Sequence, residues 1–130
     1  MNLQTMTAPV GRLLLSAIFL LSLINKLGNF DGTVGYMQHM GMTFATSLFL
    51  FGAIILLAAG GLSVLLGYKA KIGATLLLVF LIPATLIFHT DFSQQVQMLM
   101  FMKNLAIMGG LLMIIAHGSG AYSLDNRLKR

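Results

Sequence analysis

The chain contains no cysteine among its 130 residues. Thiol-disulfide exchange, iron-sulfur clusters and zinc sites built from cysteine are therefore excluded within this chain. Charge is also scarce, because only 8% of the residues are charged and 58% are hydrophobic. A soluble domain has about a quarter of its residues charged. So little polar surface cannot cover a soluble globule, and we predict an integral membrane protein.

The apolar segments lack the alternation of apolar and polar residues that a membrane barrel strand requires. Helices are then the structure that satisfies every backbone group within the bilayer. With about 20 apolar residues needed for each span, the sequence predicts an all-α, integral membrane four-helix bundle that forms a single domain over residues 1–130. Its spans are expected at about 8–27, 44–67, 72–88 and 98–116.

A signal peptide is the rival interpretation of the first apolar run, Leu13 to Ile24, which follows Arg12. The run continues into Asn25 and Lys26 without the small residues of a cleavage site. Arg12 and Lys26 are also placed to reach the two membrane interfaces. We therefore predict a first transmembrane span at this position.

The basic residues predict an orientation. Four spans place the N-terminal end, the second loop and the tail on one side of the membrane, and this side receives six of the eight Lys and Arg residues. Positive loops remain in the cytoplasm, so both termini of this multi-pass protein are expected there. No basic stripe interleaved with aromatics indicates a nucleic-acid partner. The six residues are Arg12, Lys69, Lys71, Arg127, Lys129 and Arg130.

The connection between the first two spans, NFDGTVGYMQHMGM at 29–42, has aromatic and methionine anchors. This composition favours a short interfacial helix that forms a lid on the bundle. Paired glycines, Gly60-Gly61 in the second span and Gly109-Gly110 in the fourth, allow backbones to approach closely. We expect a contact between these two spans.

Polar residues gather where the fourth span begins, in FHTDFSQQVQMLMFMKN at 88–104. Asp91 and Gln94 have the spacing of a capping box, which predicts the start of a helix. Lys103 lies deeper: at about 1.5 Å per residue it is about 21 Å from the inner boundary near His117, within a core about 30 Å thick. Snorkelling to the interface is one interpretation of Lys103. An intramembrane charge beside Asn104 favours a functional site.

The same outer half of the bundle receives polar residues from the end of the first span, from the connection at 29–42 and from the end of the third span. We predict a polar pocket at the outer mouth, suited to a quinone head group or a small anion. Two histidines with one nearby carboxylate are a weak signal for a metal, and no metal is predicted. On the opposite face, Arg12 and Asp125 are predicted to form an ion pair. The candidate pocket residues are Asn25, Lys26, Tyr36, His39, His89, Asp91, Lys103 and Asn104.

Several segments resemble the DoxX family of small four-helix membrane proteins, most closely its YqjF-like inner-membrane branch. The resemblance covers nearly the whole chain. The run F-x-K-N-L-x-x-x-G-G and the terminal S-L-D are its most specific parts. The matching segments are GRLLLSAIFLLSLINKL, GGLSVLLGYKAKIGA, FHTDF, MFMKNLAIMGGLL and GAYSLD.

The resemblance implies a membrane subunit linked to quinone or quinol oxidoreduction, since family members are similar to a thiosulfate:quinone oxidoreductase subunit. Other members are linked to oxidative-stress complexes. No catalytic residue is assigned, and fold similarity alone does not transfer chemistry. The motif matches Arg12, Lys26, His89, Lys103, Asn104 and Asp125.

This chain departs from the family at one position. Many relatives carry an acidic residue shortly before the paired glycines of the second span, where this chain has Leu57, Ala58 and Ala59. If that acid pairs with the lysine of the fourth span, its chemistry is altered here. Lys103 would then need Asp91, Asp31 or the interface.

Two functions follow from these observations. A quinone-linked redox subunit, with no covalently attached group and with electrons supplied by a partner redox protein, predicts an apolar gap between helices wide enough for an isoprenoid tail. A non-enzymatic scaffold, which acts through a partner protein or as a homo-oligomer in the lipid bilayer, predicts a filled bundle. A small-solute permease is disfavoured because one four-helix unit offers no polar stripe through the membrane.

Overall fold

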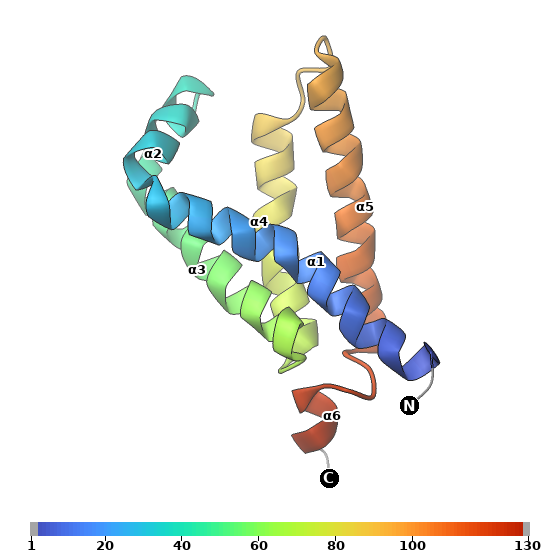
Figure 1. Cartoon of the computed structure of the whole chain (residues 1–130). Helices are drawn as coiled ribbons and strands as arrows, with labels where there is room; N and C mark the ends of the chain where they lie inside the picture. Colours follow the sequence, from blue (N-terminus) through green and yellow to red (C-terminus); the bar gives the residue numbers. More distant parts are fainter. Residues whose placement is uncertain (1–2, 129–130) are drawn as a thin grey trace.

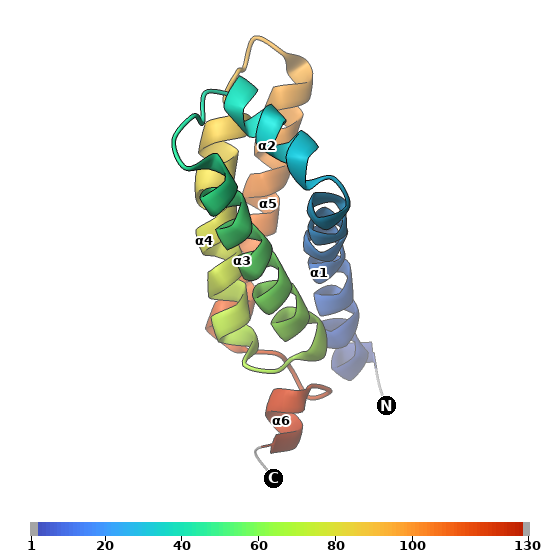
Figure 2. The ribbon, with the colours of Figure 1, turned by 90° about the vertical axis from the view of Figure 1, so that its left-hand side faces the viewer.

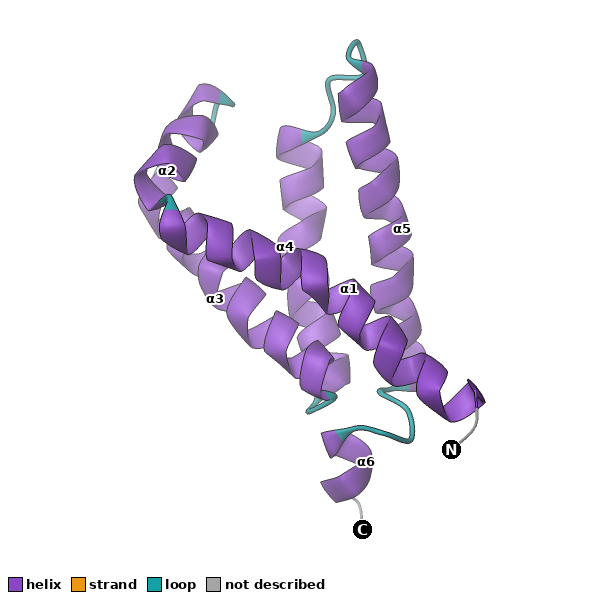
Figure 3. Cartoon of the chain, viewed as in Figure 1, coloured by secondary structure: helices purple, strands orange, loops and turns teal. Residues whose placement is uncertain are grey.

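The computed structural model describes residues 3–128, and every regular element in this range is a helix (Figures 1 and 3). The predicted all-α architecture is confirmed. The elements, in chain order, are α1 (Leu3–Gly28), α2 (Phe30–His39), α3 (Thr46–Leu66), α4 (Ala70–Phe88), α5 (Gln95–His117) and α6 (Leu124–Leu128).

Four of these helices, α1, α3, α4 and α5, are long and apolar enough to cross a membrane. They coincide with the four predicted spans, although α3 is slightly shorter than predicted and the other three are slightly longer. Large apolar side chains on their outer faces are exposed, among them Leu14, Leu21 and Leu48. Such a surface would promote aggregation in water, whereas lipid tails solvate it. These helices therefore form an integral membrane bundle.

Packing follows the order α1, α3, α4, α5. Helix α3 lies between α1 and α4, and α4 also packs against α5 (Figure 2). Small residues set the α3–α4 distance: a Cβ added to Gly60 would lie 2.9 Å from the carbonyl oxygen of Gly73. The core that joins the helices comprises Phe19, Leu57, Val64, Ala74, Leu77, Leu81 and Leu111.

The glycine pairs do not join α3 to α5, and that prediction is wrong. Gly60 faces α4, while Gly61 faces Leu20 of α1. Gly110 of α5 faces Leu15 of α1, so α1 approaches α5 at this level. Sequence alone cannot choose among three neighbouring helices for a glycine-lined face.

The bundle has two ends, which we name by their elements (Figures 1 and 2). The terminal end contains the start of α1, the α3–α4 turn, the end of α5, and α6. The α2 end contains α2 and the α4–α5 connection. The basic residues Arg12, Lys69, Lys71 and Arg127 belong to elements of the terminal end. Lys129 and Arg130, which complete the predicted basic cluster, lie outside the described residues.

The short helix predicted between the first two spans is confirmed as α2. It turns away from α1 at Asn29 and packs against both α3 and α1 (Figure 2). Its Met37 is buried. Helix α2 therefore covers part of the bundle at this end, as expected for a lid.

Candidate binding cavity

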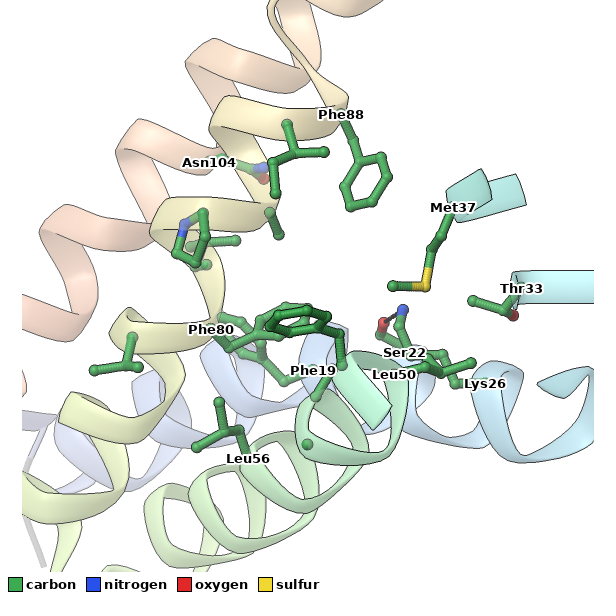
Figure 4. A pocket seen from close by; sticks show the side chains of 18 of the residues that line it. Phe19, Ser22, Lys26, Thr33, Met37, Leu50, Leu56, Phe80, Phe88 and Asn104 are labelled. Carbon is green, nitrogen blue, oxygen red and sulfur yellow. Dashed lines mark hydrogen bonds between the residues drawn. The ribbon is translucent and has the colours of Figure 1, made fainter. Parts of the chain in front are cut away.

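A cavity of about 890 Å³ opens between the helices at the α2 end. All five helices from α1 to α5 contribute to its wall. The wall is mainly apolar, with aromatic rings at its centre (Figure 4). Its principal apolar residues are Phe19, Met37, Leu50, Leu56, Phe80 and Phe88.

Lys26 brings a positive charge into this apolar space. It lies in the last turn of α1, and its Nζ donates a hydrogen bond of 2.9 Å to Ser22 Oγ, one turn earlier. The Nζ also lies 5.9 Å from the centroid of the Phe80 ring, within reach of a cation–π interaction. In Figure 4 the polar ends of Lys26 and Ser22 lie together, with the rings of Phe19 and Phe80 on one side and Met37 on the other.

Asn104 forms a second polar point on the cavity wall. It is 6% exposed, and its Nδ2 donates a hydrogen bond of 3.0 Å to Thr85 Oγ1. Thr85 in turn donates to the Leu81 carbonyl at 2.7 Å. No described residue donates to Asn104 Oδ1, which leaves this oxygen as an acceptor. The chain of bonds fixes the Asn104 side chain between α5 and α4.

Aromatic and imidazole groups lie on the wall toward the α4–α5 connection. His89 Nδ1 is 3.0 Å from Gln97 Oε1, which joins the end of α4 to the first turns of α5. Tyr36 of α2 stacks on Phe88 with ring centroids 5.7 Å apart. These contacts hold α2 and the connection against the helices that surround the cavity.

Five of the eight predicted pocket residues line the cavity: Lys26, Tyr36, His89, Lys103 and Asn104. The structure does not bring Asn25, His39 and Asp91 to its wall, and all three are exposed. Lys103 is also exposed, with its Nζ 3.3 Å from Met100 Sδ. The lysine that enters the cavity most deeply is thus Lys26.

The predicted capping box is wrong. Helix α5 begins at Gln95, and its N-cap residue, Gln94, makes no side-chain capping bond. The Asp91 carboxylate instead accepts hydrogen bonds from the backbone and the hydroxyl of Ser93. This local turn competes with capping because aspartate readily bonds to groups two residues ahead.

Sequence reasoning missed several cavity residues, including Ser22 and Phe80. Ser22 carried a usable signal, because it precedes Lys26 by four residues and so shares its helix face. Phe80 carried no sequence signal that points to the cavity, since one more aromatic residue in an apolar span indicates only burial. Thr85 as the partner of Asn104 required knowledge of how α4 and α5 are aligned.

Arg12, predicted for an ion pair, is buried at the terminal end with 5% exposure. Its guanidinium donates to the carbonyls of Val64 and Leu65 at 3.2 and 3.0 Å, and to the Tyr122 carbonyl. Carbonyls in the last turn of a helix lack intrahelical donors. Arg12 therefore satisfies the C-terminus of α3, where a positive charge is also favoured by the helix dipole.

Asp125, its predicted partner, occupies the other side of the same turn. Its carboxylate accepts hydrogen bonds from the amides of Lys69 and Ala70, at the start of α4, and from Ser119. Its own amide donates to the Gly67 carbonyl at 2.8 Å. The structure brings Arg12 and Asp125 to one junction, where they interact electrostatically and each bonds to backbone groups.

The described residues contain no group of three or more His, Cys, Asp or Glu side chains that could hold a metal ion. His39 is exposed and does not share the cavity wall with His89. The candidate site is thus a cavity with polar points supplied by Lys26, Asn104 and His89.

Comparison with protein families matches residues 8–90 to the model named DoxX. Among curated proteins, the chain is 35% identical to the inner membrane protein YqjF of Escherichia coli K12 over 130 residues, which cover 99% of this chain and 97% of the relative. It is 28% identical to the inner membrane protein YphA of the same organism over 123 residues, or 91% and 87% of the two chains. No solved structure matches.

Proposed function

Because this chain belongs to the DoxX family and is an integral protein of the bacterial inner membrane, we propose that its cavity binds the head group of a membrane quinone or quinol. The protein would serve as the quinone-binding subunit of a redox system. The observation that carries this proposal is a largely apolar cavity, inside a membrane bundle, into which Lys26 and Asn104 project polar groups.

The residues present fit such a ligand. Small-molecule pockets span about 300–1,000 Å³ and combine apolar walls with a few placed polar groups, and the cavity of about 890 Å³ has this character. The rings of Phe19, Phe80 and Phe88 offer faces and edges for an aromatic head group. The cavity supports the apolar gap that a quinone-linked subunit requires. It does not support the filled bundle expected for a non-enzymatic scaffold.

When bound, a quinone supplies an acceptor for two electrons and two protons. Lys26 Nζ would donate a hydrogen bond to a head-group oxygen, and Ser22 Oγ keeps that ammonium in place. Asn104 Oδ1 would accept from a hydroxyl, while one of the two N–H donors of its amide remains bonded to Thr85. His89 lies on the cavity wall and contacts Gln97. It is the group that would exchange a proton between the bound head group and the water at the α2 end.

Electrons would come from a partner redox protein. Where many relatives are expected to carry an acidic residue, this chain has Leu57, which is fully buried in the core. A carboxylate in α3 is therefore not part of the proposed site. The sequence had pointed to Lys103 as the intramembrane charge of a functional site, and we assign that charge to Lys26.

We further propose that the terminal end faces the cytoplasm, since the described basic residues concentrate there. The chain has no cysteine, so single substitutions can report sidedness with a membrane-impermeant maleimide. In spheroplasts, Thr90→Cys at the α2 end should react and Arg127→Cys in α6 should react only after lysis. The reverse pattern would show that the orientation is inverted.

The functional proposal is tested by binding of a short-chain ubiquinone or menaquinone analogue to the purified protein in non-ionic detergent. We expect saturable binding in the micromolar range by the wild type. Asn104→Leu should weaken binding of the analogue about tenfold. The loss of one hydrogen bond costs up to about 1.5 kcal/mol, and about 1.4 kcal/mol corresponds to a tenfold change in affinity.

Asn25→Leu is the matched control, since Asn25 lies at the same end but is exposed and does not line the cavity. It should bind like the wild type. If the folded wild type binds no quinone analogue, the cavity is not a quinone site, and the non-enzymatic scaffold becomes the better account.

A further inference from the structure

The titratable groups on the cavity wall are all neutral or positive. Lys26, Lys103, His89 and Tyr36 line it, whereas none of the three acidic residues of the chain does so. Asp31 and Asp91 are exposed at the α2 end, and Asp125 lies in α6 at the terminal end. Within the part of the chain that the structure describes, the cavity therefore contains positive charge without a carboxylate to balance it.

The Lys26 ammonium has hydrogen-bond donors that no described residue accepts. An ammonium group carries three N–H donors, and the structure assigns one of them, to Ser22 Oγ at 2.9 Å. The Phe80 ring, 5.9 Å away, offers a weak electrostatic contact and no hydrogen-bond acceptor of ordinary strength. No carboxylate of residues 3–128 lies within salt-bridge distance of Lys26. Its remaining donors are available to whatever enters the cavity.

A positive charge in an apolar membrane cavity is costly unless a partner balances it. Hydrogen bonds from an ammonium to an anionic oxygen are about twice as strong as neutral ones. A ligand that brings its own negative charge would therefore gain more from this site than a neutral ligand of the same shape. The apolar rings around Lys26 strengthen that preference, because they exclude water from the contact.

We propose that the cavity selects amphiphiles whose head carries an ionised oxygen, a deprotonated ring hydroxyl or a carboxylate, attached to an apolar ring or chain. Lys26 is the counter-ion of that oxygen, and Ser22 positions it. This inference rests on the proposed function and specifies the substrate class of the same cavity.

The experiment compares two naphthoquinones with the same ring and alkyl chain. One bears a 2-hydroxyl that is ionised at mildly alkaline pH, and the other bears a 2-methyl group and stays neutral. Binding is measured in non-ionic detergent for the wild type. We expect the ionised compound to bind about tenfold more tightly, because one charge-assisted contact contributes about 1.4 kcal/mol more than a neutral one.

Two substitutions remove the charge in different ways. Lys26→Met removes all polar contacts, and Lys26→Gln keeps a donor that can reach Ser22, so at least one variant should retain the native fold. Both should bind the two compounds with equal affinity. Lys71→Met is the matched control, because Lys71 is exposed at the start of α4 at the other end of the bundle. It should keep the tenfold preference.

The outcomes separate the two proposals. Equal binding of both compounds by the wild type, or a preference that survives in Lys26→Gln, overturns the inference and leaves the quinone site standing. Binding of neither compound overturns both. Displacement of the ionised compound by phosphatidylglycerol, but not by phosphatidylcholine, would show that a lipid phosphodiester satisfies the site and would overturn its restriction to a ring hydroxyl or a carboxylate. Insensitivity to both lipids would identify a free quinol-like compound.

Discussion

Helix α1 carries one cation toward each end of the bundle, and the two differ in their hydrogen-bond partners and in their surroundings. Arg12 at the terminal end is 5% exposed and donates to the carbonyls of Val64, Leu65 and Tyr122, with Asp125 nearby. Lys26 at the α2 end bonds to Ser22 and otherwise faces an apolar cavity.

The difference distinguishes a structural charge from a functional one. At the terminal end, Arg12 and Asp125 bond to backbone groups at the α3–α4 turn through both terminal guanidinium nitrogens and the carboxylate, and Nε of Arg12 is the buried polar atom left without a hydrogen bond among the described residues. At the α2 end, the Lys26 donors that do not bond to Ser22, and the Oδ1 acceptor of Asn104, have no hydrogen-bond partner among the described residues. Unused polar capacity in an apolar cavity favours a ligand site, whereas satisfied capacity favours stability.

The largest effect should follow from Arg12→Met. This substitution leaves the carbonyls of Leu65 and Tyr122 without the donor that Arg12 supplies, whereas the Val64 carbonyl keeps the Gly67 amide. An unsatisfied buried polar group costs about 1–3 kcal/mol. We expect the free energy of unfolding, measured by denaturing detergent titration, to fall by about 2–4 kcal/mol. Arg127→Met, at an exposed arginine of α6, is the control and should change stability little. Equal stability of the two variants would contradict a structural role for Arg12.

A smaller loss is expected for Asp125→Ala. The carboxylate caps the start of α4, and replacement of a capping side chain by alanine costs about 0.5–2 kcal/mol. Amide hydrogen exchange should also accelerate at Lys69 and Ala70. Asp91→Ala serves as the control, because Asp91 bonds only within an exposed turn. Unchanged exchange at Ala70 would show that the cap contributes nothing.

The smallest effect on stability should come from Lys26→Met. The variant loses the bond to Ser22 but also removes a charge from an apolar cavity, and the two terms oppose each other. We expect a change within about 1 kcal/mol in either direction. A loss as large as that of Arg12→Met, observed by the same titration, would show that Lys26 is structural.

The sequence predicted the helices well because their signals are local. Long apolar runs define the four spans, and the anchors around Tyr36 and Met37 indicated the short helix α2. Arg12 and Asp125 were predicted to lie at the same end of the bundle, and they do, since the number of spans alone fixes which ends meet. Their bonding to the α3–α4 turn was not predicted, because it depends on how the tail folds back after Gly118.

The cavity was harder to predict because it depends on helix packing. Lys103 attracted attention through its depth along the fourth span, yet the structure leaves it exposed. Lys26 was predicted both to flank the first span at the interface and to belong to the pocket, and it does line the cavity. Helix α1 packs on α3 and crosses the bundle obliquely (Figure 1), and its last turns line the cavity together with residues of α3, α4 and α5. Helix crossing angles are not encoded in any single segment.

The most direct test measures the melting temperature of three proteins, wild type, Asp125→Ala and Lys26→Met, with and without the ionised hydroxynaphthoquinone. Without ligand, Asp125→Ala should melt at a lower temperature than the other two. With ligand, the wild type and Asp125→Ala should gain the same increase in melting temperature, and Lys26→Met should gain a clearly smaller one, because it binds the ionised compound about tenfold more weakly. An increase of the same size in Lys26→Met as in the wild type, or one that disappears in Asp125→Ala, would contradict the division between a structural end and a binding end.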